Sequence, residues 1–133
     1  MLLALLGLSF LKHGVISFKY PTGIGVGTVV HLGHFYGLFG GSYAISFFDY
    51  GAGLGYKWDR FGASTRIHYF DYIGGDEDYR VGAEISFTGP LFHRANLFWE
   101  AGLLYAAYLH SFFSSGRLYP NVGVIYAPYL GGD

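Results

Sequence analysis

The stretch GAGLGYKWDRFGASTRIHYF, residues 51–70, alternates between two kinds of side chain with a period of two. Before Asp59 the even-numbered positions are apolar or aromatic, and the odd-numbered positions carry glycine and lysine. After Arg60 the odd-numbered positions are the apolar ones. A β-strand points successive side chains to opposite faces, whereas a helix needs apolar residues three and four positions apart. The pattern therefore predicts a β-hairpin that turns at residues 58–61.

The same alternation predicts about eight strands in total. They are expected at residues 14–20, 24–32, 42–47, 50–58, 61–70, 79–87, 97–110 and 121–127. Residues 33–41 fit no single parity, and we expect the end of a strand and a turn there. The apolar parity changes between residues 42–47 and the strand from Tyr50, which predicts a break at residues 49–51. Polar or Gly/Pro reversals are expected at residues 21–23, 74–78, 89–90 and 114–116, and Pro120 is expected to delay the last strand.

Composition limits the class of protein. The chain has 133 residues, of which 13% are charged and 21% are aromatic, and its net charge is −1. This length suits one domain, placed at residues 14–133, and the absence of a basic stripe argues against nucleic acid as a partner. The lack of cysteine excludes disulfides and thiolate metal sites. Residues 1–13 form an apolar segment too short to span a bilayer as a helix, and both a signal-peptide remnant and an apolar first segment remain open.

The charged residues fall on one face of the predicted strands. By parity the inward face carries Lys19 together with a predicted lumen charge cluster, which consists of Lys57, Arg66, Arg80, Glu84 and Glu100. The outward positions are uncharged, so we expect that face to meet lipid. A sheet in hydrocarbon must close, because its edge N–H and C=O groups would otherwise lack hydrogen bonds. The sequence thus predicts an all-β fold, a closed antiparallel up-and-down transmembrane β-barrel of about eight strands with a packed polar interior.

With this alternation, its inward glycines and its outward aromatic residues, the chain over most of residues 14–130 resembles the small bacterial outer-membrane β-barrels of the OmpA/OmpX eight-stranded type. The resemblance implies an integral protein of the bacterial outer membrane. It also implies a structural or interaction role rather than an open pore, with membrane lipid as partner and protein or lipopolysaccharide contacts through the loops. Aromatic girdles would then mark the two membrane interfaces. The candidate girdle residues are Tyr56, Trp58, Phe61, Tyr69, Tyr79, Trp99 and Tyr126. The continuation of the chain through APYLGGD departs from the pattern of such barrels.

Two other functions remain open. Ser64, His68 and Glu84 face inward and are the parts of an acyl-transfer site, which would fit a membrane-embedded hydrolase of lipid A-type acyl chains. The competing interpretation, and the stronger one, is that the inward charges neutralise one another. In particular, the strands that carry Arg66 and Glu84 are joined by the reversal at residues 74–78, so we expect them to be antiparallel neighbours whose two charges pair in the lumen. The His-x-Ser-Asn stretch of lipid A deacylases is absent. A soluble barrel that binds a hydrophobic ligand is the other alternative.

Neither a metal site nor a cofactor is predicted. The acidic residues Asp76, Glu77 and Asp78 lack the ligand spacing of a calcium loop, and no histidine pair has metal-site spacing. Substitution at an inward glycine, for example Gly53→Ser, is expected to be mild.

Overall fold

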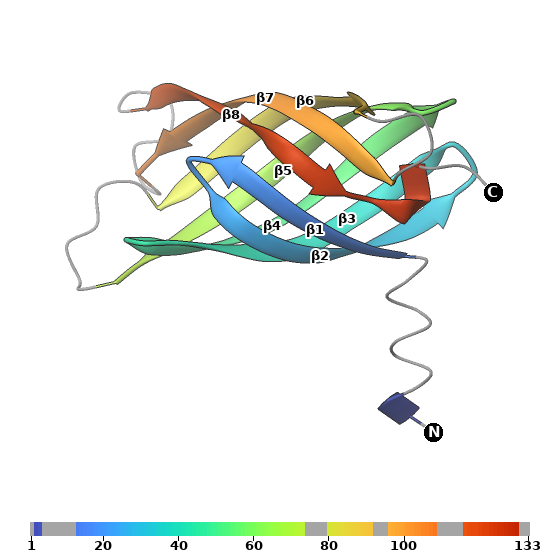
Figure 1. The fold of residues 1–133 in the computed structure, drawn as a ribbon. Helices are drawn as coiled ribbons and strands as arrows, with labels where there is room; N and C mark the ends of the chain where they lie inside the picture. The colour runs from blue at the N-terminus through green and yellow to red at the C-terminus, as the bar shows by residue number, and fades with distance from the viewer. Residues whose placement is uncertain (1, 4–12, 74–79, 92–95, 109–115, 131–133) are drawn as a thin grey trace.

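The computed structural model describes residues 2–3, 13–73, 80–91, 96–108 and 116–130. Eight strands form one closed barrel in which strands follow one another in chain order (Figure 1). They are β1 (Gly14–Tyr20), β2 (Gly23–Leu32), β3 (Phe35–Ala44), β4 (Phe47–Trp58), β5 (Phe61–Tyr72), β6 (Val81–Pro90), β7 (Leu97–Ala107) and β8 (Arg117–Tyr126). A short 3-10 helix, η1 (Pro128–Leu130), follows β8. This arrangement confirms the closed antiparallel up-and-down barrel.

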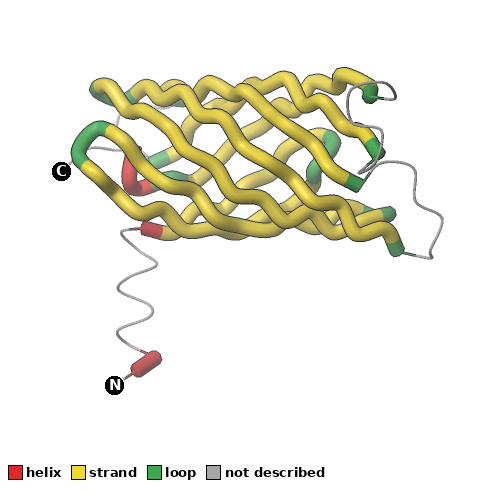
Figure 2. Tube along the Cα trace, turned by 180° about the vertical axis from the view of Figure 1, so that it is seen from behind, coloured by secondary structure: helices red, strands yellow, loops and turns green. Residues whose placement is uncertain are grey.

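Antiparallel pairing runs around the whole barrel (Figure 2). The predicted hairpin at residues 58–61 is confirmed, since Trp58 pairs with Phe61 and Asp59 has a positive φ of 57°. The barrel closes where β1 pairs with β8, with Ile16 opposite Tyr126. Most of the segment 1–13 lies outside the described residues, so its expected role stays a prediction.

The third predicted strand was wrong. Residues 35–44 form β3, and the predicted strand at 42–47 contains instead the end of β3, a turn at Ile45 and Ser46, and the start of β4. This two-residue turn accounts for the change of parity, and β4 runs through residues 49–51 without a break. Phe47, expected to face outward, faces the lumen and packs edge-on against Phe70 with ring centroids 5.5 Å apart.

Other strand ends also differ from the prediction. β7 ends at Ala107, where the strand was expected to continue to residue 110. β6 continues through Gly89 and Pro90, where a turn was expected. β8 begins at Arg117, so Pro120 lies inside it. The pairs between β8 and β1 run from Val122 to Tyr126, and Pro120 is therefore beyond the part of β8 that pairs on both edges. The expected reversals at residues 74–78 and at Ser114 and Ser115 lie outside the described residues.

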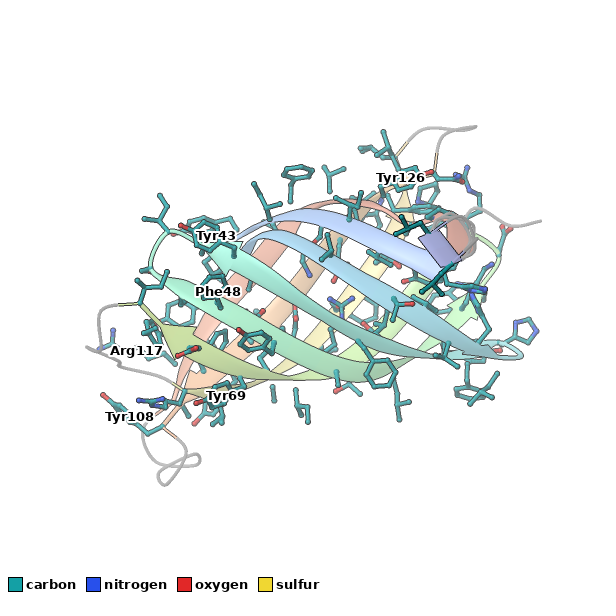
Figure 3. The ribbon with its side chains drawn as sticks, turned by 90° about the horizontal axis from the view of Figure 1, so that it is seen from below. Tyr43, Phe48, Tyr69, Tyr108, Arg117 and Tyr126 are labelled. Carbon is teal, nitrogen blue, oxygen red and sulfur yellow. The ribbon has the colours of Figure 1, made fainter. Side chains whose placement is uncertain are left out.

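The outer surface of the barrel is apolar. Its strands expose large hydrophobic side chains around the whole circumference, and Figure 3 shows side chains projecting outward from the strands. Among the described strand residues Asp71, at the end of β5, is the one charged residue at an outward position. Five candidate girdle residues are exposed, namely Tyr56, Trp58, Phe61, Tyr69 and Trp99. Tyr126 is half-buried, and Tyr79 lies outside the described residues.

The lumen has three layers. Near the chain termini an apolar cluster includes Tyr36, Phe98 and Ile125, together with Tyr129 and Leu130 from η1. Toward the other end a second apolar cluster is formed by buried Phe70, Leu104 and Ala106. Polar and charged side chains fill the space between the two clusters. The lumen is consequently packed, as predicted for eight strands.

The inward glycines of β4 differ in the space around them. A Cβ atom on Gly53 would meet the Thr65 backbone oxygen first, and it would lie 2.7 Å from Cγ of Arg66 and 3.0 Å from its Cα, so both the β5 backbone and the Arg66 stem lie close to this glycine. A Cβ atom on Gly51 would meet its nearest neighbour, the Ile67 carbonyl oxygen, at 3.4 Å. The expectation that substitution at Gly53 is mild therefore disagrees with the packing.

We expect Gly53→Ala to lower the free energy of unfolding by about 1–3 kcal/mol through overpacking. Gly51→Ala should change it by less than about 1 kcal/mol, because the methyl group has room there and alanine restricts the unfolded chain. Reversible urea unfolding of the two variants measures both values. Equal stabilities of the two variants would contradict the packing around Arg66.

Candidate functional site

The polar residues in the middle of the lumen form one layer, which we call the lumen polar layer and which contains two hydrogen-bonded groups. It consists of Lys19 (β1), Thr22 (β1–β2 turn), Asp49 (β4), Arg66 and His68 (β5), Glu84 (β6), Glu100 (β7) and Asn121 (β8). The side chains point inward because each lies at an inward position of its strand or turn. Glu84 is 1% exposed, Glu100 2% and Asn121 0%, so these groups depend on protein partners.

His68 lies between two carboxylates. Its Nδ1 is 2.8 Å from Oδ1 of Asp49, and its Nε2 is 2.7 Å from Oε1 of Glu84. A carboxylate can only accept hydrogen bonds, so both ring nitrogens must donate, and the ring is an imidazolium when both acids are ionised. His68 also stacks on Phe70, with ring centroids 5.8 Å apart and planes 2° from parallel. These contacts fix the ring in one orientation.

The network continues from Glu84 to the β1–β2 turn. Asn121 donates from Nδ2 to Oε2 of Glu84 at 2.9 Å, and Thr22 donates from Oγ1 to Oδ1 of Asn121 at 3.1 Å. On the other side of His68, the hydroxyl of Ser42 donates to Asp49 at 3.3 Å. This chain of contacts links β3, β4, β5, β6 and β8 across the barrel.

Glu100 is shared by two cations. Arg66 Nη2 lies 2.7 Å from Oε1 of Glu100, and Lys19 Nζ lies 3.0 Å from the same oxygen. Arg66 and Glu84 are register neighbours on β5 and β6, as predicted. The expected ion pair between them is not formed, however. The Arg66 guanidinium reaches across the lumen to Glu100, while Glu84 binds His68 and Asn121.

Lys57 and Arg80, the other members of the predicted charge cluster, lie away from the lumen polar layer. Lys57 donates from Nζ to the backbone oxygen of Tyr129 at 2.6 Å and so binds η1 near the chain termini. Burial raises the pKa of the Tyr129 hydroxyl well above its usual range, so this hydroxyl is neutral. Arg80 precedes β6 and donates from Nη1 to the hydroxyl of the outward-facing Tyr69 at 3.3 Å. The predicted cluster is thus divided between the middle of the lumen and the two barrel ends.

The hydrolase alternative finds no support in the geometry of Ser64. The Ser64 hydroxyl is buried and bonds to the hydroxyl of Ser86 at 2.8 Å. Both nitrogens of His68 are occupied by carboxylates, so neither can accept a proton from Ser64. Ser64, His68 and Glu84 all face the lumen, but they do not form a nucleophile–base pair.

Metal binding is equally unsupported in the part of the chain that the structure describes. There, no group of three or more His, Asp or Glu side chains has an arrangement that could hold a metal ion. The nitrogen and oxygen atoms of the Asp49, His68 and Glu84 side chains are already hydrogen-bonded to one another, to Ser42 and to Asn121.

Comparisons with protein families, with curated proteins and with solved structures find no match to this chain. In the described residues, no helix has the length and hydrophobicity to cross a membrane.

Three residues of this site were not recognised from the sequence pattern. Asp49 was placed at an expected break, and Thr22 was placed in a turn with no role. Asn121 was assigned to the last strand, and no hydrogen-bond partner was predicted for its side chain. The signal that could have found Asp49 is its parity, since it shares the inward face of β4 with Gly51, Gly53 and Lys57 once the break is removed.

A double-mutant cycle on Arg66 and Glu100 tests the observed pairing. Glu100→Gln should lower stability more than Arg66→Met, because it leaves two buried cations, Arg66 and Lys19, without their carboxylate. We expect a coupling energy above about 1 kcal/mol between Arg66→Met and Glu100→Gln in urea unfolding.

The matched comparison is the cycle of Arg66→Met with Glu84→Gln, which should show a smaller coupling because this pair makes no direct ion pair. A larger coupling for Arg66 with Glu84 than with Glu100 would restore the pairing expected from register alone.

Proposed function

We propose that this protein is an integral membrane β-barrel of the bacterial outer-membrane type, with a structural or interaction role rather than an open pore. The observation that carries the proposal is the distribution of charge. Three carboxylates and their cations are buried in the lumen, while the described outward strand positions are uncharged with the exception of Asp71. An outer surface in contact with hydrocarbon explains why the outward face carries almost no charge. Neutralisation of the buried carboxylates by the buried cations explains how the inward face can carry many charges.

Strand length supports a membrane location. Seven of the eight strands have 10 to 12 residues. Ten residues of antiparallel strand rise about 34 Å, which becomes roughly 24–28 Å across the membrane at tilts of about 35–45°. The apolar band of outer-membrane barrels is about 25 Å tall. The strands are therefore long enough to cross such a band.

Aromatic residues gather near both barrel ends. Next to the β4–β5 turn, Trp58 stacks on Phe61 with ring centroids 6.4 Å apart and lies 6.1 Å from Tyr56. At the other end Tyr43 and Phe48 flank the β3–β4 turn with centroids 5.2 Å apart. Figure 3 shows Tyr43, Phe48 and Tyr69 toward one end and Tyr126 toward the opposite end. Amphipathic rings at two levels are the arrangement expected of interfacial girdles.

The soluble-carrier alternative requires the opposite arrangement. A soluble barrel that binds a hydrophobic ligand has an apolar cavity and a polar exterior. Here the exterior is apolar and the interior holds the lumen polar layer between two packed apolar clusters. Membrane lipid is accordingly the partner that the outer surface favours.

The role of such a barrel is expected at its ends. The connections at residues 73–80 and 108–116, on the side away from the chain termini, are longer than the two-residue turns at 21–22 and 45–46 on the same side. The first includes Asp76, Glu77 and Asp78. We propose that partners contact the protein there, while the barrel anchors these connections at the membrane surface.

Charged substitutions on the outer surface test membrane insertion. Leu54 and Ile85 are exposed, and both pair with Thr65, midway along the strands. Leu54→Arg or Ile85→Arg should make folding into lipid bilayers less favourable by about 2–4 kcal/mol, because the cation would enter hydrocarbon. Folding into vesicles, followed by heat-modifiable gel mobility, measures the effect.

The matched control is Ile45→Arg, since Ile45 is 92% exposed but lies in the β3–β4 turn at the barrel end. It should fold into vesicles like the unaltered chain. A chain that is soluble and monomeric without detergent, or that tolerates all three substitutions equally, would overturn the membrane proposal.

A packed lumen should not conduct ions steadily. Phe98 and Ile125 are buried at one level and Glu84 and Asn121 at another, which leaves no wide water path between them. Planar-bilayer recordings of the pure protein should show no large, long-lived conductance steps. Reproducible steps of porin size would require a wider or oligomeric barrel and would contradict the packed interior.

A further inference from the structure

The 3-10 helix η1 enters the lumen after β8, at the barrel end that carries the chain termini (Figure 1). Tyr129 is 5% exposed and Leu130 is 0% exposed. Both belong to the apolar cluster at this end of the lumen, in which Tyr36, Phe98 and Ile125 lie on strands. η1 is therefore a segment outside the barrel wall that fills part of the lumen.

Tyr129 borders a cavity and also reaches the barrel mouth. It forms part of the wall of a cavity of about 90 Å³ that extends to Asp49 and His68 in the lumen polar layer. Its ring also contacts His31, with centroids 5.7 Å apart, and His31 is exposed one residue before the end of β2. Tyr129 thus lies between the cavity and the solvent at this end.

The cavity suits water. It has room for several water molecules, and polar side chains from five strands line it. The charged side chains in its wall already take part in ion pairs, so the cavity does not require an ion.

η1 is held by contacts that can break without opening the barrel wall. The Tyr129 ring packs on Tyr36 with centroids 5.1 Å apart, and Lys57 donates from Nζ to the Tyr129 backbone oxygen at 2.6 Å. None of the strand pairs that the structure describes includes a residue of η1. A segment outside the strand ladder opens at a lower cost in free energy than the strands do.

The opposite end of the lumen is closed in a different way. Phe70, Leu104 and Ala106 are buried there, and Phe47 and Tyr119 pack against them. All five side chains lie on strands, where backbone pairing holds them in the wall. This end cannot open unless the wall itself rearranges.

We propose that η1 is a movable stopper, which admits water and small uncharged solutes to the cavity when Tyr129 leaves the lumen. The lumen is then a chamber with one gated entrance, at the end of the chain termini. It is not a channel, because the apolar cluster at the other end stays closed. The stopper lies inside the barrel and does not depend on whether the outer surface meets lipid.

The chain contains no cysteine, so a single substituted cysteine reports access to the cavity. Ser17 lines the cavity from β1, and Ser17→Cys in the full chain can be labelled with methyl methanethiosulfonate, a small uncharged thiol reagent. Labelling should be slow while the stopper is in place, because it follows the population of the open state. Adding Tyr129→Ala should raise the labelling rate, measured by mass spectrometry, by about tenfold or more.

A second variant and two controls complete the test. Lys57→Met removes the donor to the Tyr129 backbone oxygen but leaves every ring in place, so it should also raise the rate and serves if Tyr129→Ala does not fold. Tyr119→Ala is the matched control, because it removes a tyrosine from the apolar cluster at the other end, and it should leave the rate unchanged. Ser46→Cys, in the exposed β3–β4 turn, should be labelled rapidly in every background.

Three results would overturn the proposal. One is rapid labelling of Ser17→Cys in the otherwise unaltered chain, which would show another entrance. The second is equal acceleration by Tyr129→Ala and Tyr119→Ala, which would show general loosening of the barrel. The third is a labelling rate that neither Tyr129→Ala nor Lys57→Met changes.

Discussion

The pairing of β1 with β8 is the constraint on which the rest of this structure depends. Once Ile16 is opposite Tyr126 and Tyr20 is opposite Val122, the sheet has no free edge. Every inward side chain is then confined to a lumen whose width is set by eight strands. Because the barrel is closed, the inward side chains must pack together in the lumen. Each charged group there can pair only with the few residues that share this space.

Glycine makes that packing possible. The inward positions of β4 are rich in glycine, and large side chains from other strands lie over them. The Tyr36 ring lies over Gly55, and the Arg66 stem lies over Gly53. At Gly51 the nearest side chain is the His68 ring, whose Nδ1 would lie 3.5 Å from an added Cβ atom, which is an ordinary contact. Glycines that look equivalent by parity thus have different roles, which depend on what the opposite wall places against them.

Parity alone was sufficient to predict the hairpin at residues 58–61, the number of strands and the inward face of Lys19, Lys57, Arg66, Glu84 and Glu100. It failed at residues 42–47, because a tight turn at Ile45 and Ser46 contains an apolar residue that looks like part of a strand. It also could not predict which charges pair. Register placed Glu84 beside Arg66, but the length of the guanidinium side chain lets Arg66 reach Glu100 across the lumen. Cross-lumen contacts depend on barrel geometry, which no local pattern contains.

His68 shows why the lumen charges need one another. A neutral imidazole could donate to Asp49 or to Glu84, but not to both, and the second carboxylate would then keep only its neutral donor, Ser42 for Asp49 or Asn121 for Glu84. The imidazolium serves both acids, and Asn121 completes the acceptor capacity of Glu84. Because this network joins strands from both sides of the closure, any change at His68 acts on several strand pairs at once. The interior of the barrel is thus specified by hydrogen-bond requirements, while the exterior is specified by hydrophobicity alone, and this difference explains why the outer positions can be large, varied and apolar without a particular partner for each.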